Sequence, residues 1–77
     1  MIRQVRGIVV GAEAGGIVVD VAGWGTLVNV AAPETYAEGM EITLKTYLAV
    51  KQDGMELYGF SDEAERRFFE LLLGVPG

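Results

Sequence analysis

The first sixty residues contain short apolar runs separated by glycine-containing breaks. The runs are rich in valine and isoleucine, which favour β-strands, and the breaks recur roughly every 8–12 residues, as in small all-β domains. The pattern predicts five strands, at 2–11, 15–23, 26–32, 41–51 and 55–60. Because no helical segment separates them, we expect an antiparallel barrel or sandwich and not a parallel sheet.

The pattern changes to a helical period between residues 62 and 73. Polar side chains at i, i+3, i+4 and i+7 predict a solvent-facing side, and apolar side chains repeat on the other side. The polar set is Glu63, Arg66, Arg67 and Glu70, and the apolar set is Ala64, Phe68, Leu71 and Leu72. Ser61 or Asp62 is expected to cap the start of the helix. Gly74 and Pro76 are expected to end it.

The full apolar stripe of this helix is wider than one contact with a small barrel requires. It comprises Phe68, Phe69, Leu71, Leu72 and Leu73. Either the helix plugs the barrel and tolerates the surplus, or part of the stripe contacts another domain or subunit.

The dipeptide Asp53-Gly54 lies between two apolar runs and is a strong hairpin signal. It predicts a type I′ turn, in which both residues have positive φ. The flanking residues allow Val50 to pair with Met55 and Leu57 to turn inward. Local geometry alone therefore explains Asp53 as a turn residue. The second interpretation is a working charge at the tip of a projecting hairpin.

The composition narrows the classes of function. The chain has 77 residues, 51% of them hydrophobic, which suits one small domain with a single core. It contains no cysteine and no histidine, so disulfides, thiolate metal sites and most nucleophile–base pairs are excluded. We expect no catalytic site, no metal and no cofactor. A net charge of −5 argues against wholesale phosphate binding. No stretch resembles a signal peptide or a membrane span, so a cytoplasmic domain is expected.

Three stretches carry a resemblance to a known family. They are "MIRQVRGIVV" at 1–10, "VDVAGWGTLVNV" at 19–30 and "LAVKQDGMELYGFSDEAERRFFELLL" at 48–73. The most distinctive part is "LYGF" followed by an acid-rich helix start. From its first residue to its last, the chain resembles the N-terminal domain of the RuvA family of bacterial Holliday junction-binding proteins.

The resemblance implies an all-β fold, a five-stranded OB-fold barrel over residues 1–60, followed by one C-terminal α-helix. Residues 61–77 would form this helix and a linker toward an absent helix-hairpin-helix domain, with Gly77 matching the opening glycine of that motif. Family members form homotetramers that bind a four-way DNA junction and engage the RuvB motor ATPase through a further domain. The resemblance thus implies a non-catalytic subunit that acts in branch migration during recombination and DNA repair.

The family also has an acidic pin, a hairpin near the fourfold axis whose negative charge repels phosphates at the crossover. Carried onto this chain, the pin falls on Gln52 and Asp53. The family usually has two adjacent acids there, and the amide of Gln52 halves the formal charge of the tip. Lys51 would contact a phosphate or neutralise Asp53, unless it is an ordinary solvated lysine at a strand end. Glu56 would supplement the pin if its side chain faced outward.

The resemblance gives the apolar helix stripe a partner as well. An interdomain or subunit contact would involve Phe68, Phe69, Leu72 and Leu73.

A generic OB-fold module for protein interaction or single-stranded nucleic acid binding is the alternative function. In such a module Trp24, which lies between two glycines, would stack on a base; otherwise it would pack on the barrel or on a neighbour. Four more aromatic residues would form a stacking face or belong to the core and its cover, namely Tyr36, Tyr47, Tyr58 and Phe60. Arg3 and Arg6 fall at odd spacing on one strand and point to opposite faces, so no basic stripe is expected.

Overall fold

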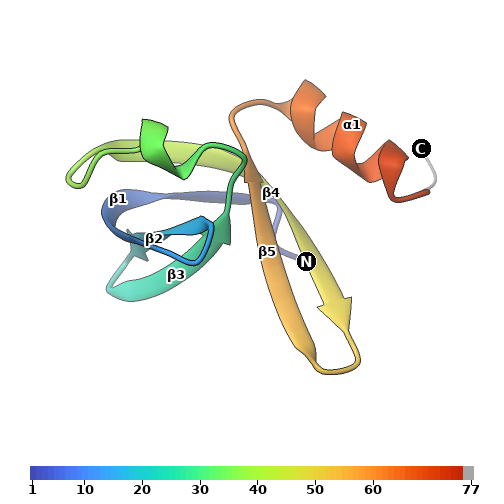
Figure 1. Ribbon diagram of the computed structural model, residues 1–77, viewed down its shortest axis with the longest axis horizontal. Coiled ribbons are helices and arrows are strands. Elements are labelled where there is room, and N and C mark those ends of the chain that lie inside the picture. The colour runs from blue at the N-terminus through green and yellow to red at the C-terminus, as the bar shows by residue number, and fades with distance from the viewer. Residues whose placement is uncertain (76–77) are drawn as a thin grey trace.

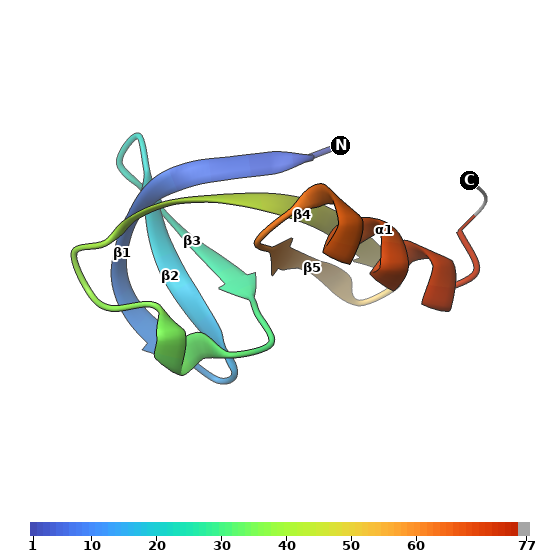
Figure 2. The ribbon, with the colours of Figure 1, turned by 90° about the horizontal axis from the view of Figure 1, so that it is seen from above.

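The computed structural model describes residues 1–75 and confirms the five predicted strands and the C-terminal helix (Figure 1). The elements are β1 (Gln4–Glu13), β2 (Gly16–Val21), β3 (Trp24–Asn29), the 3₁₀ turn η1 (Pro33–Thr35), β4 (Glu41–Lys51), β5 (Gly54–Phe60) and α1 (Glu63–Leu72). The strands form a closed barrel, and α1 lies against β4 and β5 outside it (Figure 2). The architecture is the predicted OB-fold barrel.

The barrel closes in the order β1-β2-β3-β5-β4, and its seam corrects one expectation. Four neighbouring pairs are antiparallel, but β3 and β5 run parallel and meet where Asn29 pairs with Tyr58. A ring with an odd number of strands cannot have every neighbouring pair antiparallel. Five strands that close therefore require one parallel seam, even without a helical crossover.

The interior is a small aliphatic core. It consists of Val5, Val9, Ile17, Val19, Val28, Ile42, Leu44 and Leu57. Thr46 is fully buried among them, and its hydroxyl donates to the carbonyl oxygen of Ile2 at 2.9 Å, which satisfies the polar group. Gly59 faces the same interior, where a Cβ atom would lie 2.6 Å from Cγ1 of Val28 and 2.9 Å from Cδ1 of Leu44. Glycine is required there because two core side chains already fill the space.

The helix docks on the opposite side from the one that its pattern predicted. Arg66 and Glu70, expected to face solvent, are only 7% and 6% exposed, whereas Phe68 and Leu72 are 64% and 70% exposed. Arg66 and Glu70 therefore lie on the docked side together with the half-buried Phe69, whereas Glu63 is exposed as expected. The helix does not plug the barrel. Charged residues can occupy this position because Arg3 and other residues of α1 supply their partners.

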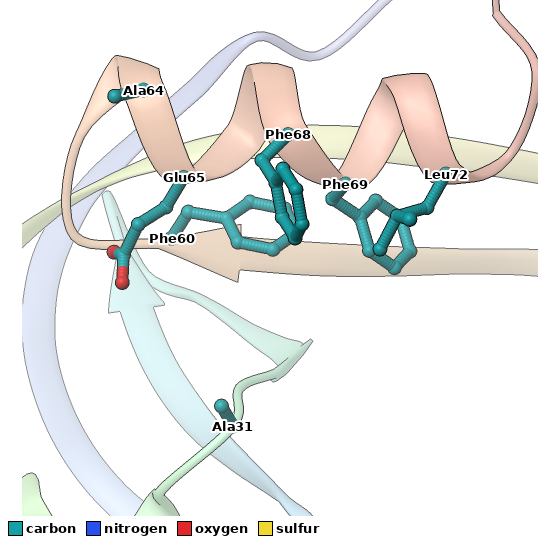
Figure 3. A pocket seen from close by; sticks show the side chains of 7 residues that line it. All are labelled: Ala31, Phe60, Ala64, Glu65, Phe68, Phe69 and Leu72. Carbon is teal, nitrogen blue, oxygen red and sulfur yellow. The ribbon is translucent and has the colours of Figure 1, made fainter.

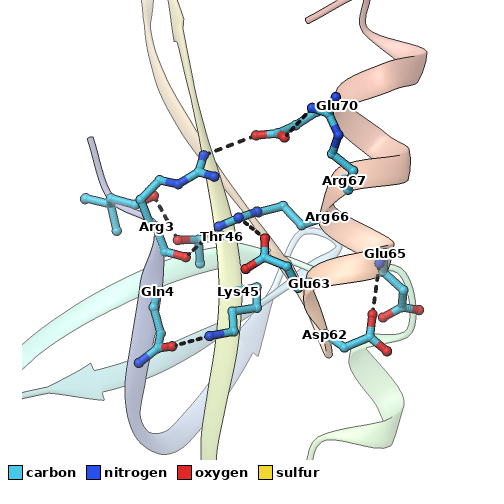
Figure 4. A network of polar contacts seen from close by, with 11 residues as sticks. Arg3, Gln4, Lys45, Thr46, Asp62, Glu63, Glu65, Arg66, Arg67 and Glu70 are labelled. Carbon is cyan, nitrogen blue, oxygen red and sulfur yellow. Dashed lines mark hydrogen bonds and ion pairs between the residues drawn. The ribbon is translucent and has the colours of Figure 1, made fainter. Parts of the chain in front are cut away.

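A polar network joins α1 to the start of β1 (Figure 4). The guanidinium of Arg66 donates to the carbonyl oxygen of Arg3 at 3.2 Å and pairs with Glu63. The carboxylate of Glu70 accepts from the Arg3 guanidinium at 3.1 Å and lies 3.6 Å from that of Arg67. Each buried charge thus has an opposite charge beside it, as burial requires.

Both helix ends are closed by local hydrogen bonds. The carboxylate of Asp62 accepts from the backbone N–H of Glu65 at 2.9 Å, so Asp62 is the cap. At the other end Gly74 has φ +82°, and its N–H donates to the Leu71 carbonyl while that of Val75 donates to the Glu70 carbonyl. This pair of bonds is a Schellman motif, which needs a residue tolerant of positive φ. Pro76, the other predicted stop, lies outside the described residues.

Substitution of Gly59 tests the packing of the core. Gly59→Ala introduces a methyl group into occupied space and should destabilise the fold by about 1–3 kcal/mol, the usual cost of overpacking. Gly11→Ala is the control, because a Cβ atom there meets nothing within 4 Å. Urea unfolding of both variants measures the difference. Equal midpoints would contradict the assignment of Gly59 to the interior.

A second pair of substitutions tests how the helix docks. Glu70→Ala removes a buried carboxylate with two arginine neighbours and should cost about 1–3 kcal/mol of unfolding free energy. Leu72→Ala trims an exposed side chain and should change it by about 0.5 kcal/mol or less. Thermal and urea unfolding report both values. The reverse order would mean that the apolar face of α1, and not its polar face, holds the helix.

Candidate nucleic-acid interface

The β4–β5 hairpin extends beyond the barrel that it helps to close (Figure 1). The two strands pair with each other from Lys45–Phe60 out to Lys51–Gly54. The last bond from β4 to the β1 side is the Thr46 N–H to the Arg3 carbonyl, and β5 pairs with β3 at Tyr58 alone. The side-chain amide of Asn29 also donates to the Leu57 carbonyl at 3.2 Å. Beyond the Leu48–Leu57 pair the hairpin is a two-stranded ribbon with two free edges, and its tip projects away from the barrel.

The tip consists of Gln52 and Asp53, both exposed. Neither has positive φ, and Gly54 has φ +149°, so the predicted type I′ turn over Asp53 and Gly54 is wrong. The register explains the difference, because Lys51 pairs with Gly54 and leaves Gln52 and Asp53 as the two connecting residues. Within residues 1–75 the carboxylate of Asp53 accepts no hydrogen bond and forms no ion pair. Its charge is therefore free to act on a molecule outside the barrel.

Lys51 is engaged by Glu56 and not by Asp53. Its ammonium lies 2.6 Å from one carboxylate oxygen of Glu56, and the hydroxyl of Tyr58 donates to the other at 3.1 Å. The hydrogen bond and charge of Glu56 raise the pKa of Lys51, with a minor contribution from Asp53. The same bond, together with that of Tyr58, lowers the pKa of Glu56. Both charges are compensated within the ribbon, which leaves Asp53 as the unmatched charge at its end.

The aromatic residues divide into two environments. The ring of Phe69 lies on those of Tyr47, Tyr58 and Phe60, with centroids 5.9, 5.2 and 5.0 Å apart, so α1 covers this surface. Tyr36 packs against the core. Tyr47, Tyr58 and Phe60 are thus covered by the helix and Tyr36 packs on the core, so these four residues do not form an open stacking face. Trp24 is 77% exposed at the start of β3, so the expectation that it packs on the barrel is wrong.

An open apolar groove of about 420 Å³ lies between α1 and the segment after β3 (Figure 3). Its lining is Ala31, Phe60, Ala64, Glu65, Phe68, Phe69 and Leu72. Three of the four residues expected at a domain or subunit contact line this groove, and the fourth, Leu73, is 54% exposed beside it. Phe69 differs from the other three because its ring is half-buried against the β4–β5 aromatics.

Basic side chains offer little attraction for phosphate. Of the six lysines and arginines, Arg3, Arg66, Arg67 and Lys51 each lie against a carboxylate. Lys45 donates to the neutral amide of Gln4 at 2.6 Å, and Arg6 is exposed on β1. Among residues 1–75 no three acidic side chains gather in a way that could hold a metal ion. No helix in the same range is long and apolar enough to cross a membrane.

These features define a class of protein, a small OB-fold domain with a projecting acidic-tipped hairpin and an outer helix that leaves its apolar face open. Residues 1–59 match the family model described as the RuvA N terminal domain. The chain belongs to the RuvA N-terminal domain family.

Individual relatives agree with the family match. The chain is 43% identical over 79 residues to the Holliday junction branch migration complex subunit RuvA of Thermus thermophilus, covering all of this chain and 41% of the relative. It is 45% identical over 80 residues to that of Symbiobacterium thermophilum, of which 39% is covered, and 39% identical over 82 residues to that of Chloroflexus aggregans, of which 41% is covered. The chain spans about two fifths of the length of these relatives. Gly77, expected to open the next motif, lies outside the described residues.

The ion pair of the ribbon predicts a pH dependence. Because the pKa of Glu56 is lowered from 4.5, its pairing stabilises the hairpin above that pH and is lost as the pH falls through the lowered pKa. The pKa of Lys51 is raised from 10.5, so its contribution is present below 10.5 and is lost as the pH rises through the raised pKa. NMR titration of the Glu56 side-chain carbon should give a midpoint below 4.5, and Lys51→Gln should move it upward. An unchanged midpoint in that variant would show that the pair does not form in solution.

Proposed function

We propose that residues 1–60 form the N-terminal OB-fold domain of a subunit that binds four-way DNA junctions during branch migration. The support is membership of the family, the names of the relatives and one structural observation. That observation is the free carboxylate of Asp53 at the end of a ribbon that projects from the barrel. In this role the domain performs no bond chemistry and shapes DNA by charge.

The carboxylate acts by repulsion. In a homotetramer four copies of Asp53 would surround one axis, and each would face the phosphates of strands that exchange partners. Two unit charges about 10 Å apart interact by roughly 0.4–0.8 kcal/mol at an effective dielectric constant of about 40–80. Such a ring biases the strands toward an open crossover without forcing it. Gln52 contributes an amide and no charge, so this chain has one acid per tip.

Attraction for the phosphates then has to come from elsewhere. Four of the six cations here already lie against three carboxylates, with Arg3 and Arg67 sharing Glu70, and the relatives contain polypeptide beyond the part that matches this chain. We assign the phosphate contacts to a helix-hairpin-helix domain reached through residues 61–77, and contact with a RuvB-type motor ATPase to a further domain. The groove formed by Phe68, Phe69 and Leu72, with Leu73 beside it, would be covered by the next domain or by a neighbouring subunit. The protein would work in the cytoplasm, where its DNA lies.

A chimera tests the proposal directly. This chain replaces the matching residues of the Thermus thermophilus relative, and binding to a four-way junction is compared with binding to duplex of equal length. The chimera should prefer the junction by about tenfold or more, or about 1.4 kcal/mol, whereas the 77-residue chain alone should bind both weakly. Equal affinity of the chimera for the two DNAs would reject the proposed function and favour a generic OB-fold module.

Charge substitutions at the tip test the role of Asp53. In the chimera, Asp53→Asn should reduce the open, near-planar form of the junction, and Gln52→Glu should increase it. Energy transfer between dyes on adjacent arms measures this geometry, and the branch-migration rate gives a second readout. Glu34→Gln, on the η1 turn, makes the same change in charge away from the ribbon and should have no effect. If all three variants matched the parent, Asp53 would be a turn residue and nothing more.

A further inference from the structure

An exposed apolar pair lies next to the charged tip. Val50 and Met55 face each other across the ribbon, one pair inward from the Lys51–Gly54 pair that closes it. They are 68% and 69% exposed. Directly paired residues on neighbouring strands point to the same face of a sheet, so the two side chains form one continuous apolar surface.

This pair is the outer end of a row that begins in the core. On the same face the next pair inward is Leu48 and Leu57, of which Leu57 is 7% exposed. The opposite face of the ribbon carries the Lys51–Glu56–Tyr58 network. The ribbon is therefore amphipathic up to its tip, although the barrel contacts that bury its apolar face end at the Leu48–Leu57 pair. Large apolar side chains at such a position are characteristic of a contact surface.

We propose that Val50 and Met55 contact the flat faces of nucleobases at the centre of the junction. This inference rests on the proposed function of the chain. In an open four-way junction the arms do not stack on one another, so the last base pair of each arm has an uncovered face. Apolar side chains, methionine among them, cover such faces in proteins that unstack DNA, and stacking contacts tolerate any base sequence.

The size and charge of the tip favour bases over a second copy of the chain. A standard protein interface buries roughly 800 Å² on each partner, and two side chains at the end of a narrow ribbon supply a small part of that. Joining the tips of two copies through this pair would also bring their Asp53 carboxylates together, which costs energy through like-charge repulsion. A base face carries no net charge and has the width of a residue pair. The tip thus combines a carboxylate that repels phosphates with an apolar pair that receives bases.

The experiment uses the chimera with near-isosteric substitutions. Val50→Thr with Met55→Gln removes the apolar character and keeps the size of exposed side chains, so the fold should be little affected. Val10→Thr is the control, because Val10 is 46% exposed on β1 away from the ribbon. A four-way junction carries 2-aminopurine in the base pair next to the crossover, and its fluorescence reports stacking. Light scattering gives the assembly mass of every variant.

The double variant should lose at least about half of the fluorescence change that the parent chimera produces, while the control retains it. Its assembly mass should equal that of the parent. Fluorescence identical to the parent's would overturn the inference, and so would a fall in mass, which would assign the pair to a contact between subunits. Energy transfer between the arms separates the apolar contact from the charge effect: Asp53→Asn should lower the fluorescence change only in proportion to its loss of the open form, whereas the double variant should lower it at an unchanged open fraction. Failure of the parent to prefer junctions would instead reject the proposed function.

Discussion

Strands β4 and β5 pair with each other further than β1 and β3 pair with them, and this difference in length determines where the hairpin tip lies. β1 and β3 support this ladder only as far as Thr46 and Tyr58, yet the pairing continues to Lys51 and Gly54. The Leu48–Leu57 pair still packs in the core, but beyond it the ribbon depends on cross-strand contacts and on the Lys51–Glu56 pair. A two-stranded ribbon is marginal in water by itself, and here the barrel anchors one end of it. The position and exposure of the tip follow from that single mismatch of strand lengths.

The docking of α1 shows where pattern analysis of a single chain stops. The helical period, the cap at Asp62 and the stop at Gly74 were predicted correctly, because each depends on residues within one turn of its own position. The direction in which the helix faces was predicted wrongly. Amphipathicity identifies two sides but does not show which side has partners, and the decisive partner of Glu70 is Arg3, at the other end of the chain. Residues so far apart in the sequence leave no mark of their contact in the polar and apolar pattern of the helix itself.

For the β4–β5 hairpin as well, the features that depend on local sequence were predicted and those that depend on distant strands were not. Pairing of Val50 with Met55 and the inward turn of Leu57 follow from alternation and were predicted. The turn type was not predicted, because the ladder extends one pair further, to Lys51 and Gly54, and leaves Gln52 and Asp53 as the turn residues, neither with positive φ. Exposure of Val50 and Met55 could not be predicted either, since it depends on how far neighbouring strands extend. Alternation alone would have placed both residues in the core.

The distribution of charge explains why, in the proposed function, this domain repels DNA strands and a different domain attracts them. A domain that both attracted and separated DNA strands would need cations near its tip, and these would cancel the repulsion of Asp53. Here the nearest cation, Lys51, is held by Glu56 on one face of the ribbon. Of the remaining cations, Arg3 fastens α1 to the barrel through Glu70, and Arg66 and Arg67 pair with Glu63 and Glu70 within the helix. The ion pairs of α1 thus occupy cations that would otherwise be open to phosphate, and in the proposed function the domain would steer DNA that another part of the assembly holds.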